Sequence, residues 1–557
     1  MKRIYLIVFS LLSSYSSLKA QLPTFDWAKQ LNSDYADYAD LITTDERSNV
    51  FVVGRNDSSI YYSYNKISIS KIDANGNTVW SKSLNRAFGL EYKGIIYDGN
   101  SNLYLIGNFH HTVDFDPGPN IQNLTALSID IFIQKIDTNG NLMWVKQLKG
   151  GGLAIDLIKG PNNTINIYGS YSGSLDFDPG PGTYYDTSFQ SSTQVFVMNM
   201  DALGNFQWVK FFHGHSNAPQ GIIHGTAITT DNNNNIYLTG DYAHDVDFDP
   251  GQGIQTITTS MTSAFVLKLD YHGNYIWVKG FNGNNTCYGK DLTTDKEGNI
   301  YIIGSFNGTI DFDPGSAVQN LTALGFFDVF IQKMDSMGNF LWVKQTASGN
   351  NSITYYERLT SDHLGNLYST TTFSGTMDID PSNAVQNLTS SATDAFLQKL
   401  DTNGNLLWVY QLGGNGDDQI SSTCIDTALN IWTVGYFEQT ADFDPGANVF
   451  NMTSMGNYDG FIQKLDTKTA IQTIGNIPLP TFTIYPNPTS KDLFIVFTNP
   501  QNKISIILKN VFGQSIRQFQ FNNTSHVQIE INEPNGIYFL EVENEQKQKT
   551  ITKVILN

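Results

Sequence analysis

The sequence has few cysteines, few charged residues and few long apolar runs. Its two cysteines, Cys287 and Cys424, are too few for a disulfide framework, so we expect free and mostly buried thiols. Charged residues make up 15% of the chain, well below the roughly 25% of an ordinary soluble domain. After the first twenty residues no stretch approaches the ~20 apolar residues of a membrane span, so we expect no span in the mature protein.

Basic residues are scarcer than acidic ones. The chain has 33 Lys and Arg against 52 Asp and Glu, which gives a formal net charge of -19. The resulting field repels phosphate backbones, so nucleic acid is excluded as an expected partner. By contrast, 47 Gly, 28 Tyr and 35 Phe favour β-structure with many turns over a helical bundle.

The first twenty residues have the layout of a secretory signal peptide. Lys2 and Arg3 precede the apolar run 4–12, and small and polar residues then lead to Ala20. We expect cleavage after Ala20, although Leu18 is larger than the residue usual three positions before the cut. A buried terminal strand is the alternative interpretation of this segment.

A seven-fold repeat accounts for most of the chain. Seven of the eight tryptophans stand 53 to 69 residues apart, and six of them begin a Trp-x-Lys pattern. A Phe-Ile-Gln-Lys-type segment and an alternating segment that ends in Gly, such as 299–304, recur at the same spacing. Each repeat therefore predicts four short strands bounded by Asp-x-x-Gly-Asn turns. The repeated tryptophans are Trp27, Trp80, Trp144, Trp208, Trp277, Trp342 and Trp408.

Four-stranded units of this kind cover their faces by packing around a ring. We therefore predict an all-β fold in which residues 21–470 form a seven-bladed β-propeller. The chain starts with a lone Trp strand at Trp27, whereas the last repeat, around Phe461, lacks one. The N-terminal strand is thus expected to complete the last blade and remove an open edge. An open solenoid is the structural alternative.

The repeat also resembles known families. Its Asp-x-x-Gly-Asn-x-x-Trp pattern resembles the tryptophan-docking repeat of quinoprotein-like propellers, and the whole unit resembles the SBBP β-propeller repeat of exported bacterial proteins. This resemblance covers residues 21 to about 470. It implies packing between blades, rather than ligand stacking, for the seven tryptophans. No quinone cofactor is expected, because only the docking repeat matches that class.

Residues 481–557 form a different module after a linker at 471–480. Short alternating segments predict a small Ig-like β-sandwich. Segments within this module resemble the type A C-terminal sorting domain of the type IX secretion system, with an ordinary adhesive sandwich as the alternative. The resemblance implies a Bacteroidetes-type bacterium, transit through the periplasm, the type IX secretion machinery as a partner, and a secreted or cell-surface location. The matching residues are Tyr485, Pro486, Asn487, Pro488, Gly513, Gly536, Tyr538 and Lys553.

The most suggestive candidate site is the sequence Asp-Phe-Asp-Pro-Gly, which six of the seven repeats carry in some form. In extended backbone its two carboxylates point the same way and offer oxygen ligands to calcium, the one candidate cofactor. Asp before Pro-Gly is also a strong turn signal, and the lack of a third acidic position favours a turn. The candidate ligands are Asp114, Asp116, Asp176, Asp178, Asp247, Asp249, Asp311, Asp313, Asp378, Asp380, Asp442 and Asp444.

No catalytic or cofactor-binding residues are predicted. His213, His215 and His224 lack an acidic or Cys ligand at fixed spacing, so we expect a solvent loop there. The sequence has no nucleophile elbow, phosphate loop or Cys nucleophile pattern. We interpret the protein as an extracellular or cell-surface binding or scaffold protein for a glycan or protein. The alternative is a secreted enzyme that acts on polysaccharide through residues on propeller loops.

Overall fold

The computed structural model describes residues 22–31, 36–57, 65–84, 89–188, 193–214, 221–283, 285–349, 354–382, 384–467, 482–510, 514–544 and 549–557. The expected signal peptide, 1–20, and linker, 471–480, lie outside these ranges. The chain divides into two compact units, Met1–Thr469 and Ala470–Asn557. The described residues are mostly β-strand with one 3-10 turn, η1 (Pro161–Asn163), and they include no helix suited to crossing a membrane.

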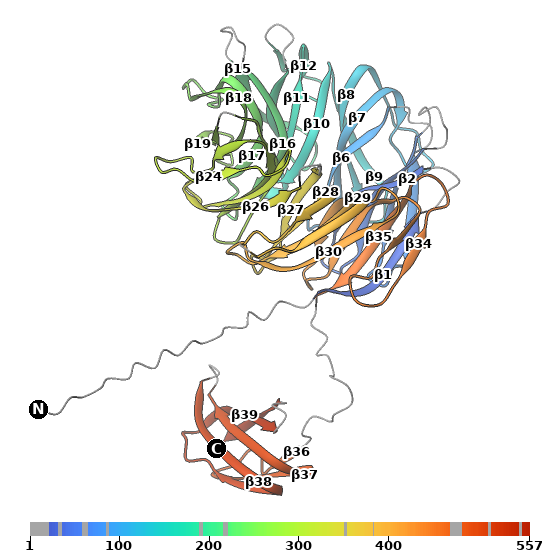
Figure 1. The fold of residues 1–557 in the computed structure, drawn as a ribbon. Helices are drawn as coiled ribbons and strands as arrows, with labels where there is room; N and C mark the ends of the chain where they lie inside the picture. Colours follow the sequence, from blue (N-terminus) through green and yellow to red (C-terminus); the bar gives the residue numbers. More distant parts are fainter. Residues whose placement is uncertain are drawn as a thin grey trace, which may run out of the picture. The chain divides into compact units, whose positions relative to one another are not determined.

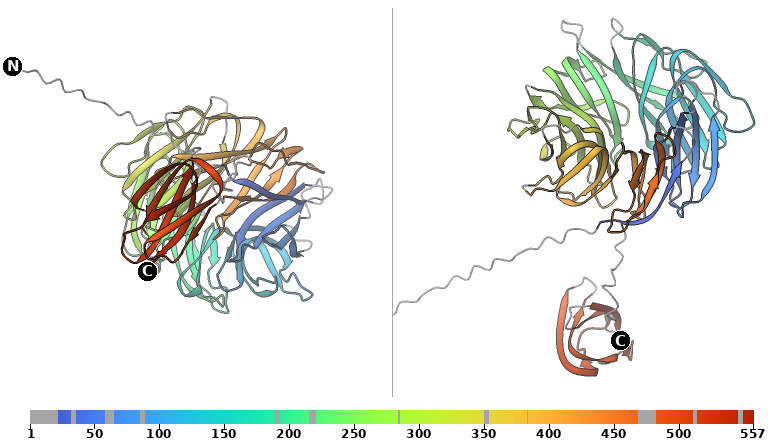
Figure 2. Two further views of the ribbon diagram at one scale, coloured as in Figure 1. Left: turned by 90° about the horizontal axis from the view of Figure 1, so that it is seen from below. Right: turned by 45° about the vertical axis from the view of Figure 1, so that its right-hand side comes forward.

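The first unit is built of four-stranded antiparallel sheets that follow one another along the chain and surround a common centre (Figures 1 and 2). The first strand of each sheet contacts the first strands of both neighbouring sheets, and the last of them contacts the first, so the ring is closed. These inner strands are β2 (Ala36–Thr44), β6 (Glu91–Tyr97), β10 (Gly152–Lys159), β16 (Ile222–Thr230), β21 (Cys287–Thr294), β27 (Thr354–Ser361) and β31 (Gln419–Ile425).

Three further strands extend each sheet outward. The second strands are β3 (Val50–Asp57), β7 (Asn102–Asp114), β11 (Ile165–Tyr171), β17 (Ile236–Asp247), β22 (Ile300–Phe306), β28 (Leu367–Asp378) and β32 (Ile431–Phe437). The third strands are β4 (Asn65–Ile72), β8 (Asn123–Asp137), β14 (Gln194–Met200), β18 (Thr256–Leu269), β25 (Asp328–Met334), β29 (Asn387–Leu400) and β35 (Asp459–Asp466). The fourth strands are β5 (Thr78–Leu84), β9 (Leu142–Leu148), β15 (Phe206–Gly214), β19 (Tyr275–Gly280), β26 (Phe340–Ser348), β30 (Leu406–Gly414) and β1 (Thr24–Leu31).

Short strands extend the outer loops of several sheets. They are β12 (Ser174–Asp176), β13 (Tyr185–Thr187), β20 (Asn282–Gly283), β23 (Thr309–Asp311), β24 (Asn320–Thr322), β33 (Thr440–Asp442) and β34 (Asn451–Thr453).

The two ends of the first unit meet in one sheet. β1 pairs antiparallel with β35, from Thr24 opposite Asp466 to Leu31 opposite Gly460, and the two strands lie side by side in Figure 1. This ladder joins segments more than 400 residues apart and leaves no open edge between the first and last sheets. The all-β propeller predicted from the sequence is confirmed, and the closed ring excludes an open solenoid.

The repeated tryptophans dock each sheet onto the next. The Trp80 indole N–H donates to the carbonyl of Thr138 at 3.0 Å. The ring also lies against Gly140 in the same turn, where φ is 76° and an added Cβ would be 3.0 Å from the indole. Gly therefore serves two needs there, a left-handed backbone and room for the ring. Equivalent indole hydrogen bonds run from Trp27, Trp144, Trp277 and Trp342 to Ala74, Ala202, Ser336 and Thr402.

The Lys of the Phe-Ile-Gln-Lys segment strengthens the same junction. Lys333 Nζ donates to the Thr402 carbonyl at 3.3 Å and lies 3.6 Å from Asp295 Oδ2. It also sits 4.8 Å from the ring centroid of Tyr301, whose hydroxyl donates to Asp295 at 3.0 Å. Lys268 and Lys464 repeat the contact with the next sheet. A buried cation is tolerated here because a carboxylate, a ring face and a carbonyl surround it.

The second unit has its own strands and core. Its strands are β36 (Phe482–Tyr485), β37 (Asp492–Lys509), β38 (Ser515–Glu530), β39 (Gly536–Asn544) and β40 (Lys549–Leu556). They form one sheet in the order β36, β37, β39, β40, with β38 paired to the long β37. Leu493, Ile506 and Leu540 are fully buried in its apolar core. An Ig-like sandwich stays a prediction for this unit.

Candidate functional site at the mouth of the central channel

A β-bulge at one equivalent place in every inner strand supplies the residues of the channel mouth. In the fifth sheet, for example, Lys290 is skipped between the paired residues Gly289 and Asp291. A bulge turns the extra side chain away from the regular ladder. The bulge residues all line cavities of the channel, and they are Asp40, Lys93, Ile155, Thr226, Lys290, Tyr356 with Glu357, and Ser421.

The bulge explains the Gly that stands opposite it within the second strand of most repeats. A Cβ on Gly304 would overlap the carbonyl oxygen of Tyr288 in the inner strand. The same clash with an inner-strand carbonyl arises at Gly107, Gly240 and Gly435. In the sixth sheet Thr371 occupies this position, and there two residues, Tyr356 and Glu357, bulge opposite it. The recurring Gly therefore marks the position opposite the bulge. The sequence shows this Gly, but only the structure shows that it faces the bulge.

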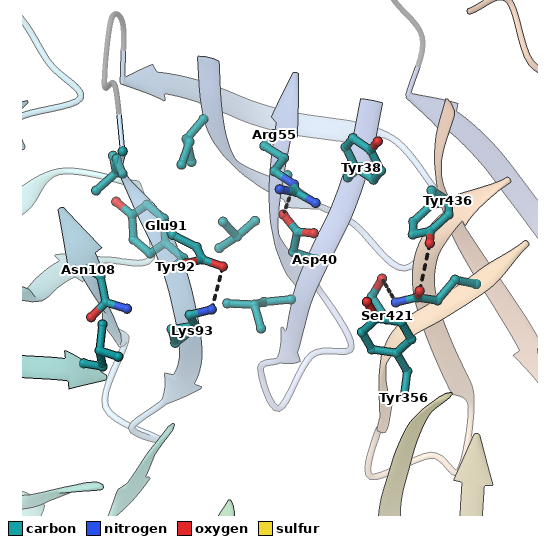
Figure 3. Close-up of a pocket in the computed structure, with 18 of the residues that line it drawn as sticks. Tyr38, Asp40, Arg55, Glu91, Tyr92, Lys93, Asn108, Tyr356, Ser421 and Tyr436 are labelled. Carbon is teal, nitrogen blue, oxygen red and sulfur yellow. Dashed lines mark hydrogen bonds and ion pairs between the residues drawn. The ribbon is translucent and has the colours of Figure 1, made fainter. Parts of the chain in front are cut away.

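The first cavity has a volume of about 860 Å³ and is lined by the first, second, third, sixth and seventh sheets. Two ion pairs lie in its wall (Figure 3): Arg55 Nε is 3.4 Å from Asp40 Oδ2, and Lys93 Nζ is 2.5 Å from Glu91 Oε1. Arg55 also stacks 4.3 Å from the ring centroid of Tyr38. These pairs offer donors and acceptors in fixed positions.

Tyrosine rings form the other part of this cavity. Tyr38, Tyr436 and Tyr458 contact one another, with ring centroids 5.1 Å apart for Tyr38 and Tyr436 and 5.1 Å for Tyr436 and Tyr458. The Tyr436 hydroxyl donates to Gln419 Oε1 at 2.9 Å, which fixes its ring. Tyr356 faces them from the sixth sheet with a left-handed φ of 56° and a side chain that is 59% exposed. A bulky residue in that conformation marks a strained position of the kind found at binding sites.

A second cavity of about 720 Å³ adjoins the first and shares Lys93, Tyr356 and Arg358 with it. Two carboxyl groups, those of Asp156 and Asp291, lie near Arg358. Burial raises the pKa of Asp156 to about 7, and it also raises the pKa of Asp291. The charge of Arg358 opposes both shifts.

The candidate calcium ligands lie in turns of the outer loops. Asp114 Oδ1 accepts the backbone N–H groups of Asp116 and Gln122 at 3.1 and 2.8 Å, and Asp116 Oδ1 accepts that of Gly118 at 2.7 Å. The other five copies repeat these bonds. Phe115 between them is fully buried, and its carbonyl accepts from Gln134 at 2.8 Å. In the described residues no three His, Cys, Asp or Glu side chains gather as a metal site.

Replacing Asp114 tests the turn interpretation directly. Asp114→Ala leaves two backbone N–H groups without their acceptor, so we expect a loss of about 1–3 kcal/mol in unfolding free energy. Asp114→Asn keeps an acceptor oxygen and should cost less. Thermal unfolding with calcium and with chelator measures both effects. A chelator-dependent shift in the wild type that Asp114→Asn abolishes would instead show a calcium ligand.

The remaining candidate residues are dispersed. His213 lies in β15 and hydrogen-bonds Gln194 at 2.7 Å, and His224 lies in β16 and hydrogen-bonds Asp241 at 3.0 Å. The expected solvent loop is therefore wrong for these two histidines, which have separate partners. His215 lies outside the described residues. Cys287 and Cys424 are free thiols, the first buried and the second partly buried.

The sorting-motif residues lie in the second unit. Asn487 ties its start to β40, because its Nδ2 donates to the Lys553 carbonyl at 2.8 Å and its Oδ1 accepts the Ile555 N–H at 2.9 Å. The Tyr538 hydroxyl donates to the Pro534 carbonyl at 2.7 Å. Tyr485 stacks on Phe494 with ring centroids 5.6 Å apart. Gly513 lies outside the described residues.

Two buried carboxyl groups near the mouth escaped the sequence reasoning. Asp394 lies within β29, the third strand of the sixth sheet, and Asp418 directly precedes β31. Burial raises the pKa of Asp418 to about 8, with the charge of Asp394 adding to the shift, and burial raises that of Asp394 to about 6. Asp394 accepts from Gln411 at 2.6 Å, the bond that Asp130 makes with Gln147 in the second sheet. The repeated Asp and Gln are the sequence signal for this buried pairing.

These raised pKa values predict a stability that falls with rising pH. Both groups retain a proton in the folded state after the unfolded chain has lost it, so their contribution is complete below about pH 4 and is lost as pH passes 6 and then 8. Asp418→Asn should therefore raise the unfolding free energy at pH 8 by at least about 1 kcal/mol. Unfolding curves at pH 5 and pH 8 measure this. Asp130→Asn is the matched control; equal gains in both variants would refute the burial account.

The closed ring and its lined mouth define a β-propeller with a second, C-terminal unit. Residues 276–310 match the family model described as beta-propeller repeat, SBBP, and residues 483–557 match the secretion system C-terminal sorting domain. The chain therefore carries an SBBP-type repeat and a type IX sorting domain, as the sequence predicts. The sorting domain marks it as secreted or associated with the outer cell surface.

Among curated proteins, an uncharacterised WD repeat-containing protein of Acanthamoeba polyphaga mimivirus is 24% identical over 473 residues. The match covers 72% of this chain and 33% of that protein, so the chain spans about a third of its relative's length.

Solved structures give weaker likenesses. A fungal alcohol oxidase of the AA5 family in complex with copper has a TM-score of 0.38 at 10% identity, covering 96% of this chain and 100% of its own. A subtype N10 neuraminidase-like protein of a little yellow-shouldered bat isolate has a TM-score of 0.29 at 9% identity. The match covers 78% of this chain and 98% of that protein. Likenesses at these TM-scores support no statement about activity.

Proposed function

We propose that the protein is an extracellular or cell-surface binding protein that holds a carbohydrate at the mouth of its channel. The observation that carries this proposal is the first cavity, where Tyr38, Tyr356 and Tyr436 stand beside fixed polar groups. A sugar ring has an apolar face and a rim of hydroxyls. Aromatic rings can stack on the apolar face. The two ion pairs, Asp40 with Arg55 and Glu91 with Lys93, can hydrogen-bond the hydroxyls.

We further propose that this mouth serves binding rather than catalysis. Asp40 and Glu91, the carboxylates of the first cavity, are each engaged by a cation, which favours a rigid binding surface over acid–base chemistry. The six Asp pairs are proposed to be turns rather than calcium ligands. Domain limits of 21–470 for the propeller and 481–557 for the sorting domain fit this division of roles.

Calorimetric titration of the full-length protein with neutral and acidic oligosaccharides tests the proposal. We expect binding that chelator does not abolish and that Tyr356→Ala weakens about tenfold, the loss of ~1.4 kcal/mol of stacking. Tyr185→Ala, which removes a 62% exposed tyrosine from β13 on an outer loop, is the matched control. Failure of every oligosaccharide to bind, or equal weakening by both variants, would overturn the proposal.

A further inference from the structure

The second cavity differs from the first in charge. It is lined by three cationic residues, Lys93, Lys290 and Arg358, and by one acidic residue, Glu357. The Glu357 side chain is almost wholly buried. The chain as a whole carries a net charge of -19, so the excess of cationic residues in this cavity is opposite in sign to the charge of the whole protein. Such a local excess of cations attracts an anionic ligand.

The three cations are not equally available. Lys93 Nζ lies 2.5 Å from Glu91 Oε1, and Arg358 lies near the carboxyl groups of Asp156 and Asp291. Lys290 Nζ instead lies 4.7 Å from the ring centroid of Tyr288, on its own strand. In the part of the chain that the structure describes, no carboxylate lies within 4.0 Å of it. Lys290 is therefore the cation best placed to bind an anion.

An aromatic wall adjoins Lys290. The rings of Phe326 and Phe327 meet edge to face with centroids 5.2 Å apart, and Phe327 contacts Tyr288 at 5.9 Å. Phe326 is 68% exposed, although exposure of so large an apolar ring is unfavourable. The second sheet has Ser128 and Ile129 at the corresponding places before its third-strand Asp. The fifth sheet thus departs from the repeat at this cavity.

We propose that the second cavity binds the negatively charged sugar of an acidic glycan, with its carboxylate or sulfate ester at Lys290 and its apolar ring face on Phe326 and Tyr288. This inference rests on the proposed function and names the ligand class for the same channel mouth. Neutral parts of the glycan would occupy the first cavity, which Lys93 and Arg358 connect to the second. An acidic sugar bound in this way gains an ion pair with the lysine and buries apolar area against the rings.

The test compares ligands that differ only in charge. Full-length protein is titrated with an oligogalacturonate, with its methyl ester, with a sulfated oligosaccharide and with a neutral oligosaccharide of equal length. Binding is measured for the wild type, for Lys290→Met, which keeps the apolar stem, and for Phe326→Ala. Lys296→Met, which removes an exposed lysine of the same sheet, is the control. Each titration is repeated at low and high salt.

We expect an acidic oligosaccharide to bind at least tenfold more tightly than the neutral one and the methyl ester. Lys290→Met should remove that preference and its salt dependence, and Phe326→Ala should weaken all charged ligands. The uronate and sulfate arms identify which anion is preferred. Equal affinity for charged and neutral ligands, unaffected by Lys290→Met, would overturn this inference while leaving carbohydrate binding intact. Absence of binding by all four ligands would overturn the proposed function as well.

Discussion

Gly304→Ala is expected to destabilise the propeller by about 3 kcal/mol or more. The added Cβ would overlap the Tyr288 carbonyl, so the bulge that presents Lys290 would have to move. Backbone on both sides of the clash is held in the ladder between β21 and β22 and has no low-cost way to shift. Loss of the bulge would also displace the channel mouth, so we expect ligand binding to fall with stability. Chemical unfolding of the purified variant measures the first effect.

The sixth sheet supplies the control for this prediction. Thr371 occupies the same place, and its two-residue bulge already accommodates a side chain. Thr371→Gly should therefore cost less than Gly304→Ala, because it removes a buried side chain without forcing the backbone to move. A Gly304→Ala protein as stable as wild type would show that the bulge does not require glycine.

Removing residues 481–557 is expected to abolish export across the outer membrane. The sorting domain is a separate compact unit with its own core, so its loss leaves the propeller's described contacts intact. The truncated protein should accumulate in the periplasm instead of at the cell surface or in the medium. Fractionation of cells that express each form, followed by immunodetection, measures this.

A point variant sharpens the export prediction. Asn487→Ala removes two hydrogen bonds to β40 and should reduce export. Lys503→Ala changes an exposed side chain of β37 outside the sorting motif and should have little effect. Normal surface delivery of the truncated chain would refute a sorting role for this domain.

The sequence was most informative about features that recur in several repeats. The recurrence of Trp80 and of the Asp-x-x-Gly-Asn turn at one spacing predicts the repeated sheet, and the resemblance to known propellers implies that the tryptophans pack between blades. The ladder of β1 with β35 was also predictable, since the first repeat has an extra Trp strand and the last lacks one. In the outer loops, Asp114 makes the backbone contacts that the Asp-Pro-Gly pattern favours.

The channel mouth was not predictable in the same way. Tyr38 and Tyr458 are 420 positions apart in sequence, and only ring closure brings their rings to 5.9 Å. The bulges that expose Lys93 and Lys290 have no residue type common to all sheets, because the other bulges carry Asp, Ile, Thr, Ser or Tyr with Glu. The residues that line the cavities stand at positions where one repeat differs from the others, as at Phe326. A comparison that looks for residues shared by all repeats does not find such positions.

Hydroxyl-radical footprinting of full-length protein, with and without a bound oligosaccharide, tests the central claim most directly. The account predicts that Tyr356, Tyr436 and Phe326 become protected, while Tyr184 and Tyr185 on the outer loop by β13 stay as reactive as before. Protection confined to the outer loops, with the channel tyrosines unchanged, would contradict the claim that the channel mouth is the binding site.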